Sequence, residues 1–234
     1  MIFNKYAKYY DELYEDKRYG NECLLVEETI EKYMEPNKRK SMVDLGCGTG
    51  THAAIFKEIG YDVVGIDNSI EMIKQAREKN NHIEFINGDV TNFKLEKPVD
   101  IAVSLFHVVS YLTSITDLNN FFKSVYDNTK DNALLIFDVW CGHGVLTDPP
   151  VVREKILKSG AIRIARPKVN LGEQTVAINY TIKDGNKTIK ETHTMRYFFK
   201  QELELLLNKN GFDLVEMTNL TSTTWNMYVV AVKK

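Results

Sequence analysis

Three glycines stand at alternate positions, Gly46, Gly48 and Gly50, between the apolar stretch 41–45 and a helix-like stretch that begins at Thr51. Glycine costs the chain backbone entropy, so it is kept where the backbone must turn sharply or approach a ligand closely. The helix start after the loop offers backbone N–H groups to an anionic group. The spacing therefore indicates a backbone cradle for a small molecule, with a plain strand-to-helix turn as the alternative.

Two acidic residues follow at places where the same ligand would need them. Asp67 ends the second predicted strand, near the distance of about 20 residues at which an acid meets ribose hydroxyls in dinucleotide-binding folds. Asp89 follows the third predicted strand, where its carboxylate would accept a hydrogen bond from an adenine amino group. Each acid alone is equally well explained by a solvated strand end or a common turn. Features after three consecutive strands together favour one nucleoside site.

Strands and helices alternate through the segment that carries these residues. Such alternation is typical of a parallel sheet with helices on both faces, and open sheets of this kind bind ligands at the carboxyl ends of their strands. The stretch 99–106 is apolar almost throughout, as a strand covered on both faces should be. We expect strands at residues 41–45, 62–67, 82–88, 99–106 and 133–139, and helices at residues 51–59, 69–80 and 117–128.

Residues 140–199 break this alternation. The stretch 141–150 is rich in turn-forming residues, and strand-like stretches joined by an Asp-Gly hairpin signal at Asp184 follow it. We therefore expect an antiparallel β insertion after the fifth strand. The pattern then returns to a helix at residues 200–209 and two closing strands.

The organisation is that of one domain over residues 1–234. Its core would occupy residues 39–139 and be completed by the helix and strands of residues 200–234. Residues 1–38 include an amphipathic helix predicted at residues 20–34 and would form a helical lid over the core.

Composition excludes several classes of partner. The chain has 30 basic and 32 acidic residues, without the basic excess of a nucleic-acid-binding surface. It has no apolar run of membrane-spanning length and no signal-peptide core at its start. Three cysteines without a CxxC pair suggest no disulfide framework and no metal site. We expect a cytoplasmic protein with a small-molecule acceptor, no nucleic acid and no membrane partner; a homodimer is compatible with this composition.

Four segments, VDLGCGTG, VVGIDNS, INGDV and IAVSLFHVVSYL, resemble the successive motifs of class I S-adenosylmethionine-dependent methyltransferases. The resemblance implies an α/β, Rossmann-like sheet of seven strands, mostly parallel, with an antiparallel last strand. It also implies that the glycine loop holds the methionine moiety, the acid after the second strand the ribose, and the acid after the third strand the adenine. Carried over, the residues that would hold the cofactor S-adenosyl-L-methionine in this core are Gly46, Gly48, Gly50, Asp67, Asn68, Met72, Asp89, Val90 and Phe106.

A nicotinamide-dependent dehydrogenase is the main rival. It would favour the spacing G-x-G-x-x-G, which seats a pyrophosphate at a helix N-terminus, whereas Thr51 and His52 follow Gly50 here. S-adenosylmethionine carries no phosphate and needs no phosphate-binding cation. An RNA methyltransferase is disfavoured by the balanced charge and by the lack of an Asn-Pro-Pro-Tyr-like motif after the fourth strand. A module that binds the cofactor without turnover stays open.

The flanks of the core suggest the acceptor. The stretches YYDELY and KRYGNE, with FHVVSYL and FDVW, resemble bacterial amino-sugar N,N-dimethyltransferases that act on nucleotide-linked deoxysugars. That resemblance matches their active-site tyrosine to Tyr14, the His or Tyr after their fourth strand to Tyr111, and a recurring histidine to His193. It implies N-methylation of an amine such as a nucleotide-linked amino sugar. Their EPWW stretch reads FDVW at residues 137–140, so another amine, or a hydroxyl, stays an alternative acceptor.

Methyl transfer from a sulfonium needs alignment, exclusion of water and, for some acceptors, removal of a proton. We expect Tyr14 and Tyr111 to face one another across the methyl group, with His107 or His193 nearby to take the proton. Tyr19 would join Tyr14 over the cofactor, although these tyrosines could equally pack an N-terminal helix, and His107 could be a packed residue. Three arginines of the insertion would meet a substrate diphosphate or lie on a solvated strand edge: Arg153, Arg163 and Arg166.

Overall fold

The structure of the protein is a computed structural model that describes residues 6–35, 40–219 and 225–234. The boundary expected between lid and core, at residues 38 and 39, lies outside these ranges. The core sheet of the described chain consists of seven strands: β1 (Ser41–Leu45), β2 (Asp62–Asp67), β3 (Glu84–Asn87), β4 (Val99–Ser104), β5 (Thr129–Cys141), β10 (Phe212–Asn219) and β11 (Asn226–Lys233).

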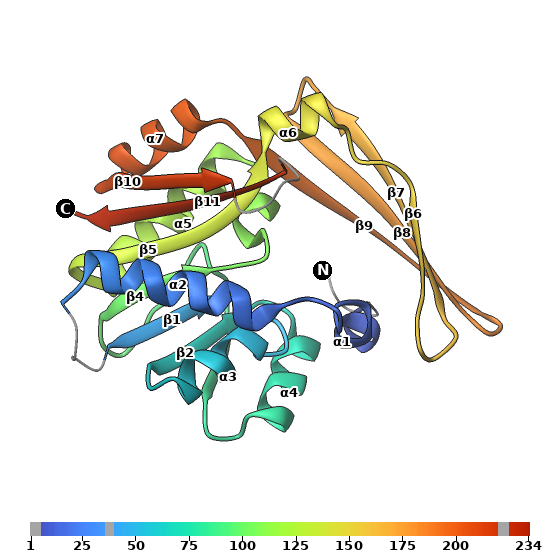
Figure 1. The fold of residues 1–234 in the computed structure, drawn as a ribbon, viewed down its shortest axis with the longest axis horizontal. Helices are drawn as coiled ribbons and strands as arrows, with labels where there is room; N and C mark the ends of the chain where they lie inside the picture. Colours follow the sequence, from blue (N-terminus) through green and yellow to red (C-terminus); the bar gives the residue numbers. More distant parts are fainter. Residues whose placement is uncertain (1–5, 36–39, 220–224) are drawn as a thin grey trace.

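These strands lie in the order β3-β2-β1-β4-β5-β11-β10 (Figure 1). The pairings from β3 through β5 are parallel, whereas β11 is antiparallel to both of its neighbours. The expected α/β fold, mostly parallel with an antiparallel last strand, is therefore confirmed.

Helices cover both faces of this sheet: α2 (Tyr19–Tyr33), α3 (Thr51–Glu58), α4 (Ile70–Lys79), α5 (Ile115–Asn128) and α7 (Lys200–Lys209). Successive side chains of a strand point to opposite faces of the sheet, and both faces of this sheet are apolar. Phe137 of β5 packs in the core shared with α5 and α7, whereas its neighbour Ile136 packs in the core shared with α2, α3 and α4. Ser69 caps α4, since its hydroxyl accepts a hydrogen bond from the Met72 N–H at 3.3 Å.

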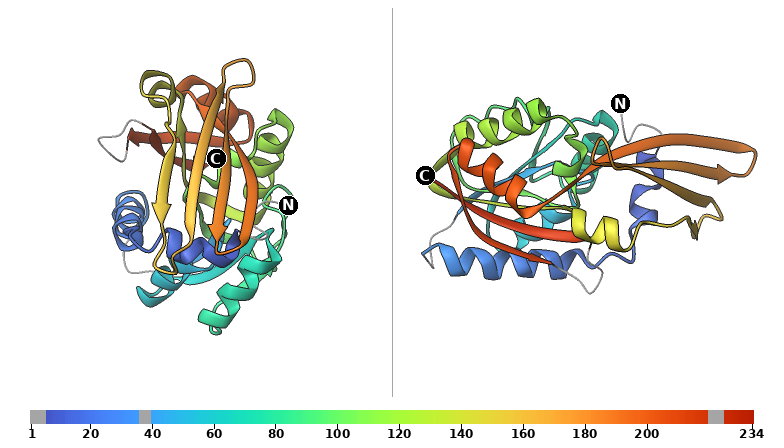
Figure 2. Two further views of the ribbon diagram at one scale, coloured as in Figure 1. Left: turned by 90° about the vertical axis from the view of Figure 1, so that its right-hand side faces the viewer. Right: turned by 90° about the horizontal axis from the view of Figure 1, so that it is seen from above.

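An antiparallel sheet follows β5, as predicted: β6 (Arg153–Ile156), β7 (Ile162–Asn170), β8 (Thr175–Asp184) and β9 (Lys187–Phe198). We call these four strands the insertion. The pairing of Trp140 in β5 with Tyr197 in β9 joins the two parts into one sheet of eleven strands within the described residues. Figure 2 shows the insertion projecting beyond the core. Its inner face therefore has only the N-terminal residues and the edge of the core to pack against.

One expectation for the stretch after β5 is wrong. The sequence predicts turns over residues 141–150, but Gly142–Thr147 form a short helix, α6. Gly142 lies against the ring of Phe199, where an added Cβ would be 2.7 Å from ring atoms. Gly142 therefore allows close packing of a helix and does not form a turn.

The N-terminal segment, residues 6–18, crosses between the insertion and the core. It contains a 3-10 helix, η1 (Ala7–Tyr9), and one helical turn, α1 (Tyr10–Leu13). On the insertion side, Lys155 Nζ donates to the Leu13 carbonyl at 2.8 Å. On the core side, the Thr49 hydroxyl donates to the Asp11 carboxylate at 2.7 Å. The segment is thus bonded both to the insertion and to the glycine loop.

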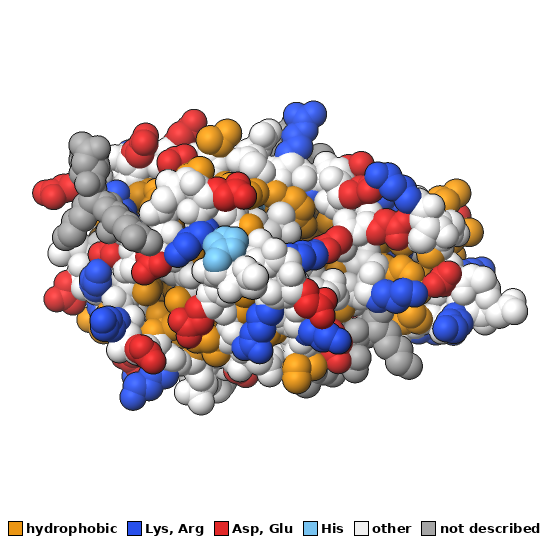
Figure 3. Space-filling model, turned by 90° about the horizontal axis from the view of Figure 1, so that it is seen from below, with side chains coloured by type: hydrophobic (Ala, Val, Ile, Leu, Met, Phe, Trp, Pro, Cys, Tyr) orange, Lys and Arg blue, Asp and Glu red, His pale blue; other side chains and the backbone are white. Residues whose placement is uncertain are grey.

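Surface charge is mixed where Figure 3 shows it. Lys and Arg side chains on that face are interspersed with Asp and Glu, as the balanced composition leads one to expect. None of the helices in the described part of the chain is both long enough and apolar enough to cross a membrane.

Candidate active site

A cavity of about 420 Å³ lies between the core, the insertion and the N-terminal segment. It opens at the carboxyl ends of β1, β2 and β4, the edge at which parallel sheets bind ligands. Most residues that the sequence predicts for the site line it: Tyr14, Tyr19, Gly46, Gly48, Asp67, Asn68, Met72, Asp89, Val90, Phe106, His107 and Tyr111. Gly50 and His193 are not among the lining residues.

The three glycines of the loop have different roles, although all have positive φ, at +76°, +55° and +79°. An added Cβ would lie 2.4 Å from the Val108 side chain at Gly46, and 2.7 Å from the Phe85 ring at Gly50. At Gly48 it would meet nothing within 4 Å. Gly46 and Gly50 are therefore required by packing, and Gly48 is the glycine that bares its backbone to the cavity. Gly50 is not among the residues that line the cavity, and its contact with the cofactor stays a prediction.

Asp67 ties the glycine loop to α4. Its carboxylate accepts hydrogen bonds from the Gly48 N–H at 2.9 Å and from the Ser69 N–H at 2.8 Å. Burial raises the pKa of Asp67, and the backbone N–H groups of Ser69, Gly48 and Asn68 oppose that rise. The acid predicted from strand order thus sits at the junction of the loop, the second strand and the following helix.

Two further acids lie below and beside this junction. Asp44, in β1 beneath the loop, is 1% exposed, and burial raises its pKa to about 6. Asp89 lies at the exposed edge of the cavity, where one carboxylate oxygen accepts from the Thr91 N–H at 2.8 Å. Asp89 is therefore oriented by a local turn, at the place expected for the adenine.

Aromatic rings gather where the N-terminal segment meets the end of β4. The rings of Tyr14 and Phe106 lie edge to face, with centroids 4.8 Å apart, and Tyr10 lies 4.8 Å from Tyr14. Lys17 places its ammonium 4.6 Å from the Phe106 centroid and 4.3 Å from the Tyr19 centroid. The Tyr19 and Phe106 rings of this wall therefore make cation–π contacts with Lys17.

Phe106 and His107 both have left-handed backbones, with φ of 67° and 64°. Successive non-glycine residues in this region are uncommon and strained. Asp138 of β5 holds them in place: its carboxylate accepts the His107 backbone N–H at 3.0 Å and lies 3.0 Å from His107 Nδ1. The strained turn presents His107 to the cavity.

Tyr111 stands in front of His193. The Tyr111 hydroxyl is 3.0 Å from His193 Nδ1, and His193 Nε2 is 3.3 Å from the Glu191 carboxylate. Burial raises the pKa of Tyr111 and lowers the pKa of His193. His193 is 1% exposed and does not line the cavity, whereas Tyr111, whose hydroxyl it contacts, does.

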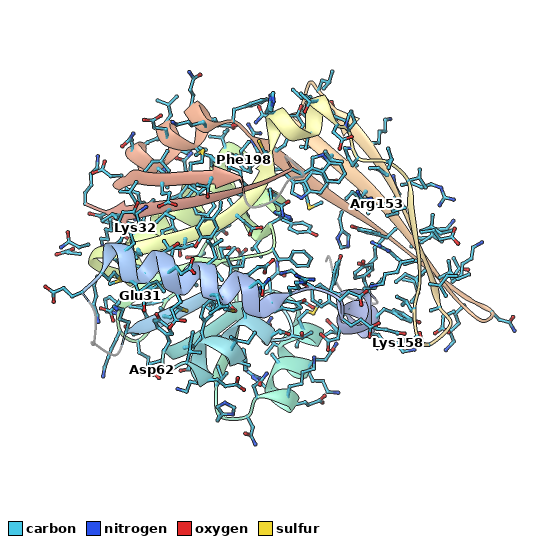
Figure 4. The ribbon with its side chains drawn as sticks, viewed as in Figure 1. Glu31, Lys32, Asp62, Arg153, Lys158 and Phe198 are labelled. Atoms are coloured by element: carbon cyan, nitrogen blue, oxygen red, sulfur yellow. The ribbon has the colours of Figure 1, made fainter. Side chains whose placement is uncertain are left out.

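The inner face of the insertion forms a wall of the cavity that was not predicted from the sequence. Arg153, labelled in Figure 4, and Arg163 line the cavity. Their guanidinium groups lie 5.1 Å from the Trp225 ring and 5.5 Å from the Tyr180 ring, respectively. Arg166 is not among the lining residues. The lining residues that sequence reasoning missed include Tyr10, Trp140, Tyr180, Met195 and Trp225. A signal for the insertion residues would have been strand register, since Arg163, Ala165 and Pro167 alternate along β7.

No group of three or more metal-ligating side chains occurs within the part of the chain that the structure describes. His143, which the sequence places near Cys141, lies exposed on α6. Hydroxyl, imidazole, guanidinium and carboxylate groups are among those that line the cavity.

Comparison with known proteins agrees with this geometry. Residues 42–132 match a methyltransferase domain family. The dTDP-3-amino-3,4,6-trideoxy-α-D-glucopyranose N,N-dimethyltransferase of Streptomyces venezuelae is 25% identical over 73% of this chain and 74% of its own. An S-adenosylmethionine-dependent methyltransferase of Clostridium acetobutylicum has the same fold, with a TM-score of 0.83, 18% identity and coverage of 100% and 99% of the two chains. The sugar N-methyltransferase KedS8 of Streptoalloteichus superposes with a TM-score of 0.83 at 19% identity, over 96% and 92% of the two chains.

Proposed function

Since this chain is an S-adenosylmethionine-dependent methyltransferase that acts on a small molecule, we propose that its cavity transfers the methyl group to the nitrogen of a small amine. The observation that carries the proposal is the junction of Gly48 and Asp67. The open face of Gly48 and the carboxylate to which its N–H is bonded line the same cavity.

The cofactor would lie along the carboxyl ends of the core strands. Its methionine moiety would pass over Gly48, its ribose hydroxyls would bond to Asp67, and its adenine would lie between Met72 and Val90 beside Asp89. Asp67 can accept hydrogen bonds from the ribose hydroxyls in addition to those from the Gly48 and Ser69 N–H groups, because each carboxylate oxygen has two acceptor sites. The sulfonium would then point toward the rings of Tyr14 and Phe106.

The acceptor would occupy the side of the cavity walled by the insertion. The named relatives include enzymes that methylate nucleotide-linked amino sugars. Arg153 and Arg163 suit the diphosphate of such a substrate, because a guanidinium pairs well with phosphate oxygens. Tyr14 and Tyr111 suit its amine, because hydroxyls orient a neutral amine without adding a buried negative charge. A hydroxyl acceptor is the second candidate, and it is favoured by a histidine that lines the cavity, His107.

The N-terminal segment would act as a lid on this site. It carries Tyr14, and it is bonded to the glycine loop through Asp11 and to the insertion through Leu13. Movement of residues 6–18 would therefore open the cofactor site and the acceptor site together. A cytoplasmic location and a homodimer stay predictions from the sequence.

Titration calorimetry and an acceptor panel test this function. The protein should bind S-adenosylhomocysteine and should not bind NAD. With S-adenosylmethionine, a dTDP-linked 3-amino-deoxysugar should gain one or two methyl groups by mass spectrometry, and its 3-hydroxy counterpart should gain none. Binding of NAD alone would refute the cofactor assignment. Methylation of the hydroxy sugar alone would replace the amine by a hydroxyl acceptor, and cofactor binding without methylation of any acceptor would point to a sensing module.

Tyr14→Phe and Tyr111→Phe should each lower turnover by about tenfold to a hundredfold, because each removes one orienting or proton-accepting bond. Affinity for S-adenosylhomocysteine should barely change. Steady-state kinetics with the acceptor found by the panel provide the measurement. Tyr9→Phe is a matched control, because the Tyr9 hydroxyl donates to Asp184 at 2.6 Å and Tyr9 does not line the cavity. Parental turnover in both site variants would mean that the acceptor binds elsewhere.

A further inference from the structure

The Asp138 carboxylate contacts His107 at two points. One of its oxygens accepts the His107 backbone N–H at 3.0 Å, and the other lies 3.0 Å from the ring nitrogen Nδ1. Nδ1 is buried and makes no hydrogen bond of regular geometry within the described residues, so the ring contact is a close approach of the carboxylate oxygen to Nδ1. The carboxylate thus holds the strained backbone and lies against the ring of the same residue.

This arrangement selects one tautomer of the imidazole. Asp138 is 5% exposed. Burial alone would raise its pKa, but the charge and hydrogen bonds of His107 and the charge of Lys17 outweigh burial, and the pKa lies below its usual value. An ionised carboxylate only accepts hydrogen bonds, so Nδ1 must carry the proton. The lone pair of the neutral ring is then on Nε2, the nitrogen that Asp138 does not hold.

We propose that Asp138 is a positioning residue that makes His107 the proton acceptor of this methyltransferase. This inference rests on the proposed function, because it needs an acceptor that loses a proton. His107 lines the cavity, whereas the other candidate, His193, is enclosed behind Tyr111. Of the pair, His107 would therefore meet the acceptor, and Asp138, which does not line the cavity, would act through it.

The step is balanced for an amine that enters as an ammonium. His107 Nε2 takes one proton from the ammonium, and the freed lone pair of the nitrogen attacks the methyl carbon. The bond from carbon to sulfur breaks, and its electrons stay on sulfur, which leaves as a neutral thioether. The imidazolium is held by the Asp138 carboxylate and releases its proton to solvent. A hydroxyl acceptor would give up its proton by the same route.

Few charges act on this pair. Asp138 comes from β5, and Lys17 comes from the N-terminal segment, where its ammonium is also paired with Glu22. The rings nearest the imidazole, Phe106 at 5.9 Å and Trp140 at 6.2 Å, do not titrate. The tyrosines of the N-terminal segment bring no charge near neutrality. Asp138, 3.0 Å from Nδ1, is therefore the charged group in contact with the His107 ring.

Asp138→Asn tests the positioning role. The side-chain amide introduced by this substitution would still accept the His107 backbone N–H through its oxygen, but its NH₂ group would donate to Nδ1 and move the ring proton to Nε2. Nitrogen NMR of histidine-labelled protein should show the neutral His107 protonated on Nδ1 in the parent and on Nε2 in the variant. Turnover near neutral pH, measured with the dTDP-linked 3-amino-deoxysugar, should fall by about a hundredfold, and affinity for S-adenosylhomocysteine should stay within about twofold.

His107→Asn is the second variant, chosen because asparagine tolerates a left-handed backbone. It should lose turnover by about a hundredfold, whereas His193→Asn should lose less and His143→Asn should behave as the parent. Parental turnover in His107→Asn would overturn the proposal. Loss of turnover in His193→Asn alone would assign the proton to Tyr111 and His193 instead. The tautomer measurement needs no ligand, so it tests the role of Asp138 by itself. Failure of the parent to bind S-adenosylhomocysteine would instead count against the proposed function.

Discussion

Gly48→Val should weaken binding of S-adenosylhomocysteine by at least about a hundredfold, the largest loss expected from a single substitution in this protein. The Cβ of residue 48 would enter open space on the cavity side, where no described atom lies within 4 Å. Two methyl groups on that carbon would fill the path proposed for the methionine moiety. The Gly48 N–H would also shift away from Asp67, because a β-branched residue is a steric outlier at a φ of +55°.

Gly185→Val separates this effect from backbone strain. Gly185 has the same φ of +55° and the same open surroundings, but it lies in the hairpin turn between β8 and β9 and does not line the cavity. A left-handed residue with a Cβ costs about 1–2 kcal/mol, so both variants should lose similar thermal stability. Only Gly48→Val should lose calorimetric binding. Equal affinity in the two variants would show that the loop around Gly48 is a structural turn.

Asp67→Ala should weaken binding of S-adenosylhomocysteine by about tenfold to a hundredfold. Hydrogen bonds to a charged group are worth about 1.5–3 kcal/mol, and removal of the carboxylate leaves the ribose hydroxyls without their acceptor. The same change removes the acceptor for the Gly48 and Ser69 N–H groups, so part of the loss reflects the loop. Melting temperature reports the structural part, and calorimetry reports the binding part.

A double-mutant cycle isolates the ribose contact. The partner change is made in the ligand, by comparing S-adenosylhomocysteine with its 2′,3′-dideoxy analogue. The parent should prefer the hydroxylated ligand by about tenfold or more, and Asp67→Ala should bind both ligands equally. If the preference survives in the variant, the ribose is held by another residue, whatever happens to the total affinity.

The core could be predicted from the sequence because its signals are local. The bounds of β1, Ser41–Leu45, and β2, Asp62–Asp67, agree with the expectation residue for residue, and Ser69 caps the following helix. An apolar strand, a glycine turn and a capped helix each depend on neighbours in the chain. Parallel strands then bring their carboxyl ends to one edge, so Asp67 and Gly48 were placed together without knowledge of any distant contact.

The insertion could be predicted only in outline. A hairpin signal shows that two strands pair, but not which face they turn inward or what that face meets. Arg153 and Arg163 line the cavity, whereas Arg166 does not. Alternation along β7 places Arg163 and Arg166 on opposite faces, but a single sequence does not say which face meets the cavity. The separation comes from the register of β6, β7 and β8 and from the way the insertion joins β5 at Tyr197.

By itself the sequence determined that this chain builds an α/β core with a nucleoside site at the glycine loop, because periodicity, turns and strand order are local properties. Tertiary structure decided which candidates reach the cavity. Gly50 packs on Phe85, His193 is enclosed behind Tyr111, and His107 is turned inward by Asp138, a residue 31 positions away in the chain. Such contacts depend on how separate elements pack. The choice of residues to propose for catalysis therefore depends on the place where β4, β5 and the insertion meet.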